Sequence, residues 1–295
     1  MTAPRVSGLS ETGALCDVVL KHPRDAFVSD AAIARQWRDL RFTAPPDFAR
    51  AVDEYDAFVR ILESAGARIH WLPAGDETSL DSIYVRDASV VFSRGVVLAR
   101  MGKALRAAEP REQGTTFETW AIPIAGAIEP PGRLEGGDVV WLDDRTVAVG
   151  EGYRTDADGI RQLRALLGDT IETLIPVPLP HWRGQEDVFH LMSILSPVDR
   201  DLAVAYSPLM PVPFRTALLD RGIALVDVPD AEFDSMGANV LALAPRRCVM
   251  LDGNPRTRAA LEEAGAEVHV YAGTEISLKG GGGPTCLTRP LSRAR

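Results

Sequence analysis

Cysteine and long apolar runs are the scarcest features of this 295-residue chain. Its three cysteines, Cys16, Cys248 and Cys286, are odd in number and widely spaced, so they build neither a disulfide framework nor a CxxC metal site. No stretch approaches the roughly 18 apolar residues of a membrane helix, and the polar N-terminus lacks the apolar core of a signal peptide. These absences predict a protein of the reducing cytoplasm with no membrane partner.

Positive charge is also in short supply. The formal net charge is −9, which disfavours a nucleic-acid partner. The sequence contains no GxxxxGK[ST] phosphate loop, no HExxH and no GxSxG, and the histidines outside the candidate site show no metal-ligand spacing. We therefore expect neither a cofactor nor a metal ion.

The most informative feature that is present is a repeat. A helical stretch followed by a short strand that ends near proline or glycine recurs along the chain, at intervals of roughly 40 to 55 residues. The expected strands are Arg68–Pro73, Glu118–Pro123, Glu172–Pro176, Ala224–Pro229 and Glu267–Tyr271. The expected helices end at Gly66, Gly168, Gly222 and Gly265, and a less regular helix lies within Gly102–Phe117.

Apolar segments between these units predict hairpins. The pairs are Ser89–Phe92 with Val96–Ala99, Val139–Leu142 with Val147–Val149, Val188–Leu195 with Leu202–Tyr206, and Val240–Leu243 with Cys248–Leu251. A fifth pair would join the C-terminal strand around Cys286 to Cys16–Leu20 and close a ring. We predict an α/β fold, a five-bladed propeller of ββαβ repeats around a central active-site channel, with residues 1–295 as one domain. The alternative, an open doubly wound sheet, would alternate single strands with helices.

Polar residues fall at equivalent positions in these repeats, where the first strand of each hairpin begins. They are Asp87, Glu135 with Asp138, His190, Asn239 and Cys286. A pseudo-symmetric ring would bring them to one channel. Each also has an ordinary structural explanation: a surface ion pair with Arg86 for Asp87, a loop acid for Glu135 and a core histidine for His190.

A run of glycines precedes Cys286. Gly280–Gly283 lets the backbone take positive φ and approach a ligand closely, and Pro284 then restricts the chain before the thiol. This pattern predicts a thiol at the mouth of a site, although a loose glycine-rich tail has the same composition. Two other segments, Ser7–Gly13 and Asp76–Asp81, are candidate lids because their composition is flexible.

The candidate side chains suit chemistry on a guanidinium group. Two carboxylates can hold a guanidinium through charge-assisted hydrogen bonds and keep its carbon electrophilic. A thiolate can then attack that carbon, and a histidine can protonate the departing amine and later activate water. The set therefore indicates nucleophilic catalysis on a guanidino compound.

The motifs resemble those of the guanidino-modifying enzymes (the amidinotransferase or pentein superfamily), and within it the dimethylarginine dimethylaminohydrolases. The resemblance covers nearly the whole chain and rests on Leu80–Asp87, Leu134–Val139, Val149–Thr155, His190-Leu191, Ala238–Val240 and Gly282–Leu287. It implies a nucleophile at Cys286, a general acid and base at His190, and a guanidinium held by Asp87 and Glu135. It further implies that Arg106 and Arg154 bind the substrate carboxylate, and that Asp81 lies near the substrate amine.

The implied activity is hydrolysis of mono- or dimethylarginine to citrulline and an alkylamine, so the expected partner is a small guanidino amino acid. Arginine deiminases and amidinotransferases, the enzyme alternatives, carry an aspartate two residues after the histidine, where this chain has Met192. Arg86, however, resembles the deiminases. Non-catalytic ribosome-associated factors share the architecture and form the alternative of another class. The sequence leaves a homo-oligomer open.

Overall fold

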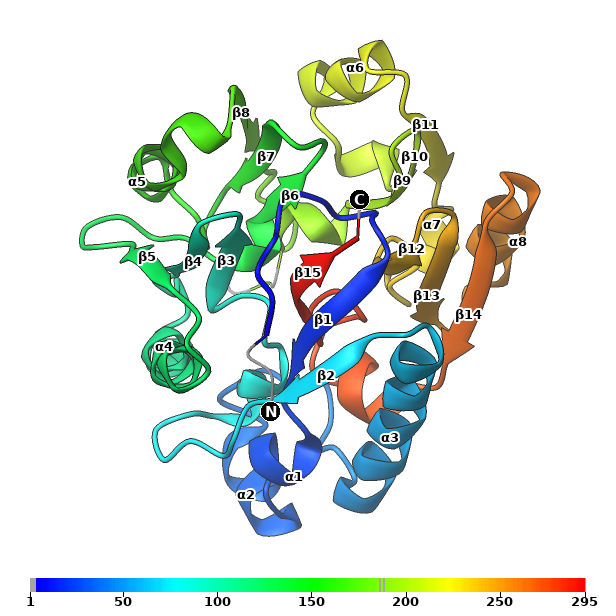
Figure 1. Ribbon diagram of the computed structural model, residues 1–295. Helices are drawn as coiled ribbons and strands as arrows, with labels where there is room; N and C mark the ends of the chain where they lie inside the picture. Colours follow the sequence, from blue (N-terminus) through cyan, green and yellow to red (C-terminus); the bar gives the residue numbers. More distant parts are fainter. Residues whose placement is uncertain (1–3, 186, 188, 295) are drawn as a thin grey trace.

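The strands of the computed structural model, which describes residues 4–185, 187 and 189–294, form five separate three-stranded sheets. In each sheet the first strand pairs antiparallel with the second, and the second pairs parallel with the third. The sheets are β15 (Arg289–Arg293), β1 (Leu15–Leu20) and β2 (Arg68–Trp71); β3 (Ser89–Phe92), β4 (Gly95–Leu98) and β5 (Ile124–Ala127); β6 (Val139–Trp141), β7 (Thr146–Glu151) and β8 (Thr173–Pro178); β9 (Leu195–Asp199), β10 (Leu202–Ala205) and β11 (Ala224–Asp227); and β12 (Val240–Ala244), β13 (Arg247–Leu251) and β14 (Glu267–Tyr271). Figure 1 shows them arranged around a centre. The predicted five-bladed α/β propeller is confirmed, and the open doubly wound sheet is excluded.

All helices but α7 connect the second and third strands of a sheet and lie on the outside of the ring (Figure 1), whereas α7 joins β11 to β12. They are α1 (Pro23–Ala26), α2 (Asp30–Gln36), α3 (Phe48–Ser64), α4 (Glu109–Thr119), α5 (Ala157–Leu167), α6 (Val212–Asp220), α7 (Asp230–Phe233) and α8 (Pro255–Glu263). The predicted glycine stops are present: Gly66, Gly168, Gly222 and Gly265 have φ of 91°, 56°, 75° and 84°. Among the described helices, none combines the length and apolar character needed to cross a lipid bilayer.

Three expected strands are placed differently by the structure. The segment Glu118–Pro123 belongs to the end of α4 and the following turn, and its strand β5 begins only at Ile124. Within the expected strand Val188–Leu195, residue 188 lies outside the described residues, Leu191–Ser193 is a 3₁₀ turn and β9 starts at Leu195. Cys286 lies in a turn before β15, because the Leu287 amide bonds back to the Gly283 carbonyl at 3.1 Å instead of to a strand.

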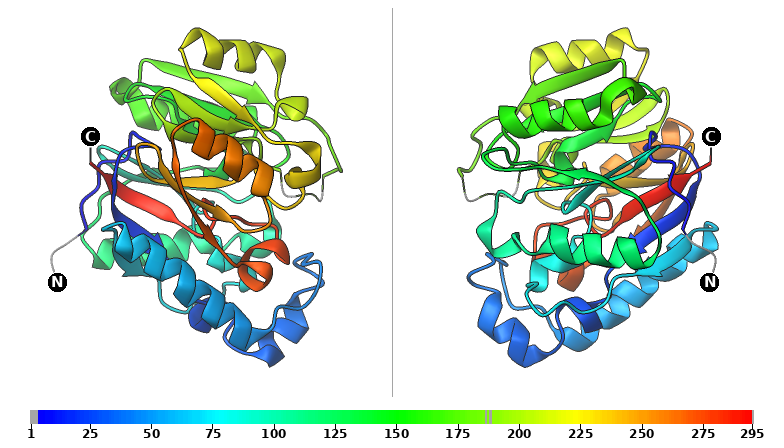
Figure 2. Two further views of the ribbon diagram at one scale, coloured as in Figure 1. Left: turned by 90° about the vertical axis from the view of Figure 1, so that its right-hand side faces the viewer. Right: turned by 60° about the vertical axis from the view of Figure 1, so that its left-hand side comes forward.

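The segment Ser7–Gly13, a candidate lid by composition, is held against the central strand. The Ser7 amide donates to the Leu291 carbonyl at 2.9 Å, and the Ala294 amide donates to the Ala14 carbonyl at 2.8 Å. Figure 1 shows this N-terminal segment arching around β15, and Figure 2 shows both chain ends on the same side of the molecule. The ring is therefore closed by the two ends of the chain.

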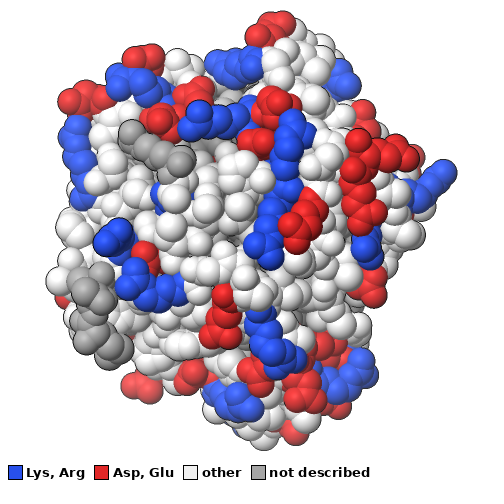
Figure 3. Space-filling model, turned by 45° about the vertical axis from the view of Figure 1, so that its right-hand side comes forward, with Lys and Arg blue, Asp and Glu red and all other residues white. Residues whose placement is uncertain are grey.

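Surface charges of both signs are mixed. On the face shown in Figure 3, lysine and arginine side chains are interspersed with aspartate and glutamate around a broad area without charged side chains. Interspersed charge of this kind does not present the continuous basic stripe that tracks a phosphate backbone.

Ring closure can be tested at Leu291, which is fully buried in β15. Replacing Leu291 with alanine should lower the free energy of unfolding by about 2–5 kcal/mol, because the lost methyl groups leave a cavity between blades. Leu219 of α6 is 45% exposed, and Leu219→Ala should change it by about 0.5 kcal/mol or less. Urea unfolding of both variants measures the difference, and equal stabilities would contradict a central role for β15.

Candidate active site

The candidate site residues occupy the turns that precede the first strand of each sheet. Asp87 precedes β3, Glu135 precedes the 3₁₀ turn Gly136–Asp138 that leads into β6, and His190 precedes the turn that leads into β9. Asn239 precedes β12 and Cys286 precedes β15. Because these strands are the inner strands of the ring (Figure 1), the turns converge at one end of its axis.

Asp87 is fixed by an arginine that is itself fixed by a second acid. Arg106, in the 3₁₀ turn Ala104–Arg106, donates to Asp87 Oδ2 at 2.6 Å. The same guanidinium donates to Glu109 Oε1 and Oε2 at 2.9 and 2.8 Å, a two-point contact that sets its plane. The other oxygen of Asp87, Oδ1, is buried and accepts no hydrogen bond among the described residues. One carboxylate oxygen is thus oriented, while the other is buried and has no hydrogen-bond partner among the described residues.

Glu135 and His190 form a buried pair. His190 Nε2 donates to Glu135 Oε2 at 2.7 Å, and His190 Nδ1 lies 3.8 Å from Asp87 Oδ1. The amides of Gly102 and Lys103 donate to Glu135 Oε1 at 2.9 and 3.3 Å. The imidazole therefore lies between two carboxylates, in an orientation held by backbone donors behind Glu135.

The missing side chain of Gly137 makes this approach possible. A Cβ atom there would lie 2.6 Å from His190 Nδ1 and 2.7 Å from Asp87 Oδ1, closer than real Cβ contacts allow. Nearby, Asp138 accepts from the Thr155 hydroxyl at 2.6 Å and from the Leu191 amide at 2.9 Å, and so ties the Glu135 turn to the His190 turn.

Cys286 is partly exposed at the end of the glycine-rich loop. The Asn239 side-chain amide donates to Cys286 Sγ at 3.6 Å, while Asn239 Oδ1 accepts from the Thr285 amide at 3.0 Å. The loop packs so closely that a Cβ on Gly282 would lie 2.3 Å from the Tyr84 ring, and Gly281 has φ of 80°. The glycine run is therefore packed structure and not a loose tail.

Cys286 and His190 open onto the same cavity. Its remaining lining includes Phe189, Met192, Phe233 and Met236, with Trp182 and Arg183 among the others. The sulfur and the imidazole can thus reach one bound molecule, which has an apolar wall beside it.

The charges around the imidazole favour its protonated form. Burial alone would lower the pKa of His190, but Asp87, Asp138 and Glu135 outweigh it and raise the pKa to about 9. Burial would raise the pKa of Glu135, but the hydrogen bond and charge of His190, together with Arg154, outweigh it and hold that pKa below its ordinary range. Burial raises the pKa of Asp138 to about 6.

The pKa of the Cys286 thiol is shifted in the opposite direction from that of an activated cysteine. Burial and the negative charge of Asp87 raise the pKa of Cys286, and the hydrogen bonds from Thr285 and Asn239 and the charge of Arg86 offset this only in part. Without a ligand, Cys286 is therefore mainly a thiol at neutral pH.

The residues expected to hold an amino-acid head group are paired with acids in this structure. Arg106 contacts Asp87 and Glu109 as described. Arg154 lies 3.4 Å from Glu135 Oε2, and Asp81 accepts from Lys103 Nζ at 2.6 Å. All three expected residues are buried near the site, and their roles toward a substrate stay predictions.

Sequence reasoning missed two supports of the site. Glu109 orients Arg106, and the spacing of three residues at the start of a helix was the available signal. Lys103, which directly precedes the turn with Arg106, forms an ion pair with Asp81. Nothing in the sequence pattern indicated this role of Lys103. Arg86 does not pair with its neighbour Asp87 as the surface explanation assumed, because its guanidinium bonds to Glu11 and the Thr285 carbonyl.

Asp87, Glu135 and His190 form the one group among the described residues with the geometry of a metal site. One oxygen each of Asp87 and Glu135 and one nitrogen of His190 lie within 4.8 Å of one another. The 2.7 Å hydrogen bond between His190 and Glu135 instead places a proton between them. An anionic cleft of this shape also fits a planar organic cation.

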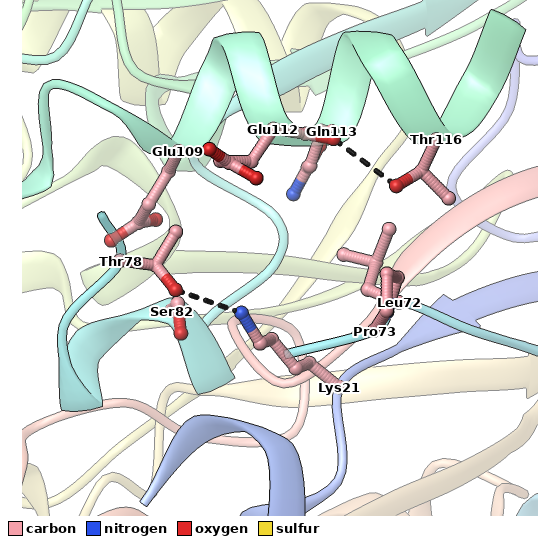
Figure 4. A pocket seen from close by; sticks show the side chains of 9 residues that line it. All are labelled: Lys21, Leu72, Pro73, Thr78, Ser82, Glu109, Glu112, Gln113 and Thr116. Atoms are coloured by element: carbon pink, nitrogen blue, oxygen red, sulfur yellow. Dashed lines mark hydrogen bonds between the residues drawn. The ribbon is translucent and has the colours of Figure 1, made fainter. Parts of the chain in front are cut away.

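A second, smaller hollow is lined by Glu109, the partner of Arg106 (Figure 4). Lys21 points into it and donates to the Thr78 hydroxyl at 3.1 Å, and Glu109 and Gln113 of α4 form the opposite wall. Its volume of about 20 Å³ has room for roughly one water molecule, so it cannot receive an amino acid.

Comparison with known proteins agrees with this geometry. The model of a family described as N,N dimethylarginine dimethylhydrolase, eukaryotic, matches residues 30–293. The chain is 31% identical to the dimethylarginine dimethylaminohydrolase of Streptomyces coelicolor over 247 residues, 82% of this chain and 86% of that protein. It is 28% identical to the enzyme of that name from Pseudomonas aeruginosa over 243 residues, 82% of this chain and 89% of that protein.

Arginine deiminases are also similar, such as that of Mycobacterium avium, with 31% identity over 248 residues, 72% of this chain and 60% of that protein. Among solved structures, the Pseudomonas aeruginosa dimethylargininase complexed with citrulline superimposes with a TM-score of 0.75 at 24% identity, covering 93% of this chain and 98% of that one. An amidinotransferase from Microseira wollei gives 0.78 at 17% identity, covering 98% and 97%. At these identities the two superpositions show the fold alone. By the match of the family model, the chain belongs to the N,N-dimethylarginine dimethylhydrolase family, whose members are hydrolases of amidine C–N bonds.

Proposed function

We propose that this protein hydrolyses Nω-methylated arginine to citrulline and an alkylamine, with Cys286 as the nucleophile. The observation that carries the proposal is the shared cavity of Cys286 and His190, next to a buried Asp87 oxygen without a hydrogen-bond partner among the described residues. Family membership supports the reaction type.

The proposed substrate contact is between Asp87 Oδ1 and the guanidinium. Arg106 already occupies Oδ2 and holds the carboxylate plane, so Oδ1 can accept a charge-assisted N–H bond without reorganising. Glu135 contributes a second negative charge on the far side of His190, and the two acids favour the cationic form of the substrate.

The cavity wall supports an alkylated substrate. Phe189, Met192, Phe233 and Met236 line the same hollow as Cys286. Transfer of a methyl substituent of the guanidinium from water to such a wall would stabilise the complex by about 0.8 kcal/mol for each buried carbon. Met192 stands where the deiminases place an aspartate, so this wall cannot accept a hydrogen bond from an unsubstituted amine as a carboxylate would.

The pKa values suggest how the thiol is activated. A bound guanidinium would neutralise Asp87 and place a positive charge near Cys286 Sγ, so it would lower the pKa of a thiol that is protonated in the free protein. The thiolate then attacks the guanidinium carbon and an S–C bond forms. The C–N bond to the alkylamine breaks, and the amine leaves with the proton of His190.

The second half-reaction uses the same histidine in the opposite sense. Neutral His190 takes a proton from water, whose oxygen attacks the thiouronium carbon. The S–C bond breaks, the second proton of the water passes to the departing sulfur, and the Cys286 thiol is restored as citrulline is released. For the head group we propose Arg106 and Arg154 for the carboxylate and Asp81 for the amine, each of which would keep its present ionic partner and share its charge with the substrate.

Deimination of free arginine is the second candidate, because an arginine deiminase of 31% identity matches this chain and Arg86 before Asp87 resembles the deiminases. Ammonia release from arginine in the absence of alkylamine release from methylarginine would select it.

The nucleophile is tested by replacing Cys286 with serine. Release of methylamine or dimethylamine should fall below detection, because a serine hydroxyl without a strong adjacent base is a poor nucleophile. Cys16→Ser is the matched control, since Cys16 is also partly exposed but lies on β1, and it should retain full activity. Amine release by Cys286→Ser at the unmodified rate would contradict the assignment.

The role of His190 predicts a pH dependence. The group is protonated below its raised pKa of about 9, so the proton donor is present at neutral pH and is lost as the pH rises through that value. We expect kcat for amine release to fall about tenfold per pH unit above this point. Stopped assays between about pH 6 and 10.5 measure it, and a profile that stays level to about pH 10.5 would exclude His190 as the acid.

The close approach at Gly137 gives a further prediction. Gly137→Ala should force His190 and Asp87 apart and lower kcat by about 100-fold, because misplacement of reacting groups by about 1 Å costs that much. In Gly152→Ala the new methyl group would meet Leu179 at an ordinary 3.5 Å, so activity should be kept. Melting temperatures of both variants separate lost activity from lost folding. A fully active Gly137→Ala would show that this spacing is not required.

A further inference from the structure

Three arginines are buried in the middle of the ring. Arg86, Arg289 and Arg293 have only 1%, 5% and 7% of their surface exposed. Arg86 lies just before β3, and the other two are the first and last residues of β15, which runs through the centre in Figure 1. Arginine is almost never buried to this extent without a charged partner.

The three arginines are linked by contacts with one another or with the N-terminal segment. Arg289 donates to the Arg86 carbonyl, and a Cβ on Gly136 would lie 2.5 Å from the Arg289 guanidinium, so that glycine makes room for it. Arg293 donates to the carbonyls of Gly13 and Ala242 at 2.7 and 2.8 Å. The N-terminal segment passes the same region, because Arg86 lies 3.3 Å from a Glu11 oxygen.

These arginines carry more positive charge and more donors than their surroundings satisfy. Glu11 is the carboxylate that pairs with Arg86, and among the described residues neither Arg289 nor Arg293 forms an ion pair. Four of their donor atoms are buried without a hydrogen-bond partner among the described residues: Arg86 Nη2, Arg289 Nε, Arg293 Nε and Arg293 Nη2. Burial and the charge of Arg86 lower the pKa of Arg289 to about 9, which reflects the same excess.

We propose that this axial cluster is a binding site for a small inorganic monoanion of chloride size, held by the free N–H groups of Arg86, Arg289 and Arg293. Water could satisfy the donors, but it would leave the excess charge in a medium of low polarity, where an uncompensated ion is costly. One anion both accepts several N–H bonds and supplies the missing negative charge. The buried setting favours a small ion over a carboxylic acid or a phosphate ester.

The route to the site passes Glu11. Residues Leu9–Thr12 line a surface hollow together with Trp141 and Arg145, and Glu11 lies between this hollow and Arg86. Glu11 therefore competes with the anion for the same positive charge. This gives the site a signature: removal of the Glu11 charge should strengthen anion binding, whereas removal of an arginine should weaken it.

Arg86 connects this cluster to the turn of the candidate nucleophile. The Arg86 amide donates to the Cys286 carbonyl at 3.2 Å, and Arg86 Nε donates to the Thr285 carbonyl at 2.9 Å. An anion bound to the Arg86 guanidinium would therefore affect the Cys286 turn through these two hydrogen bonds of Arg86.

The test is a halide titration of the full chain followed by its melting temperature. Sodium chloride and bromide replace sodium gluconate at constant ionic strength, so that screening does not change. We expect a saturable rise in melting temperature that follows ligand linkage. For Glu11→Gln, which keeps the side-chain shape, the halide Kd should fall by about tenfold or more because a nearby negative charge is gone. For Arg289→Gln or Arg293→Gln the halide response should be lost.

The control is Arg60→Gln, which removes one positive charge from the exposed face of α3 and should leave the response unchanged. If an axial arginine variant does not fold, Glu11→Gln and crystals soaked in bromide still decide the matter. An anomalous bromide peak among the three guanidinium groups supports the site. Equal melting curves in halide and gluconate, no change in Kd for Glu11→Gln, or water alone in bromide-soaked crystals would overturn it. None of these measurements depends on the proposed hydrolase activity.

Discussion

The antiparallel pairing of β1 with β15 is the contact on which the remaining structure depends. It joins the two ends of the chain in one sheet and converts four sheets in series into a closed ring. Asp17 secures the junction, because its buried carboxylate accepts from Arg68 on β2, from His70 on β2 and from Ser292 on β15 at 2.7, 2.8 and 2.7 Å. The turn with Cys286 comes just before β15, so this pairing also decides where the thiol lies.

Buried opposite charges then organise the end of the ring that carries Cys286. Glu109 orients Arg106, Arg106 orients Asp87, and Glu135 is paired with both His190 and Arg154. Buried ion pairs of this kind add little to stability because desolvation cancels much of their attraction. Their effect is geometric: each charged group has its position before a ligand arrives, so binding requires little reorganisation.

Glycines set the distances between these groups. Gly136 makes room for the Arg289 guanidinium, Gly137 for the contact of His190 with Asp87, and Gly283 for Asn239 beside the Cys286 turn. At each of these positions a methyl group would meet a neighbouring atom at 2.7 Å or less. The centre of the ring therefore holds two buried charged groups, an anionic one with Asp87 and Glu135 beside His190 and a cationic one with Arg86, Arg289 and Arg293.

Local sequence patterns determined the helices with their glycine stops, most of the strands, the order of the repeats and the chemical types of Asp87, Glu135, His190 and Cys286, because periodicity and motif spacing act over short distances. The start of β9, the end of α4 and the turn around Cys286 were decided by tertiary contacts. There, side chains such as Asp138 and Asn239 take up backbone groups that a strand would otherwise use. The equivalent repeat positions predicted that His190 and Glu135 would meet. The pairing of Arg86 with Glu11 came only from ring closure, since no local pattern records it.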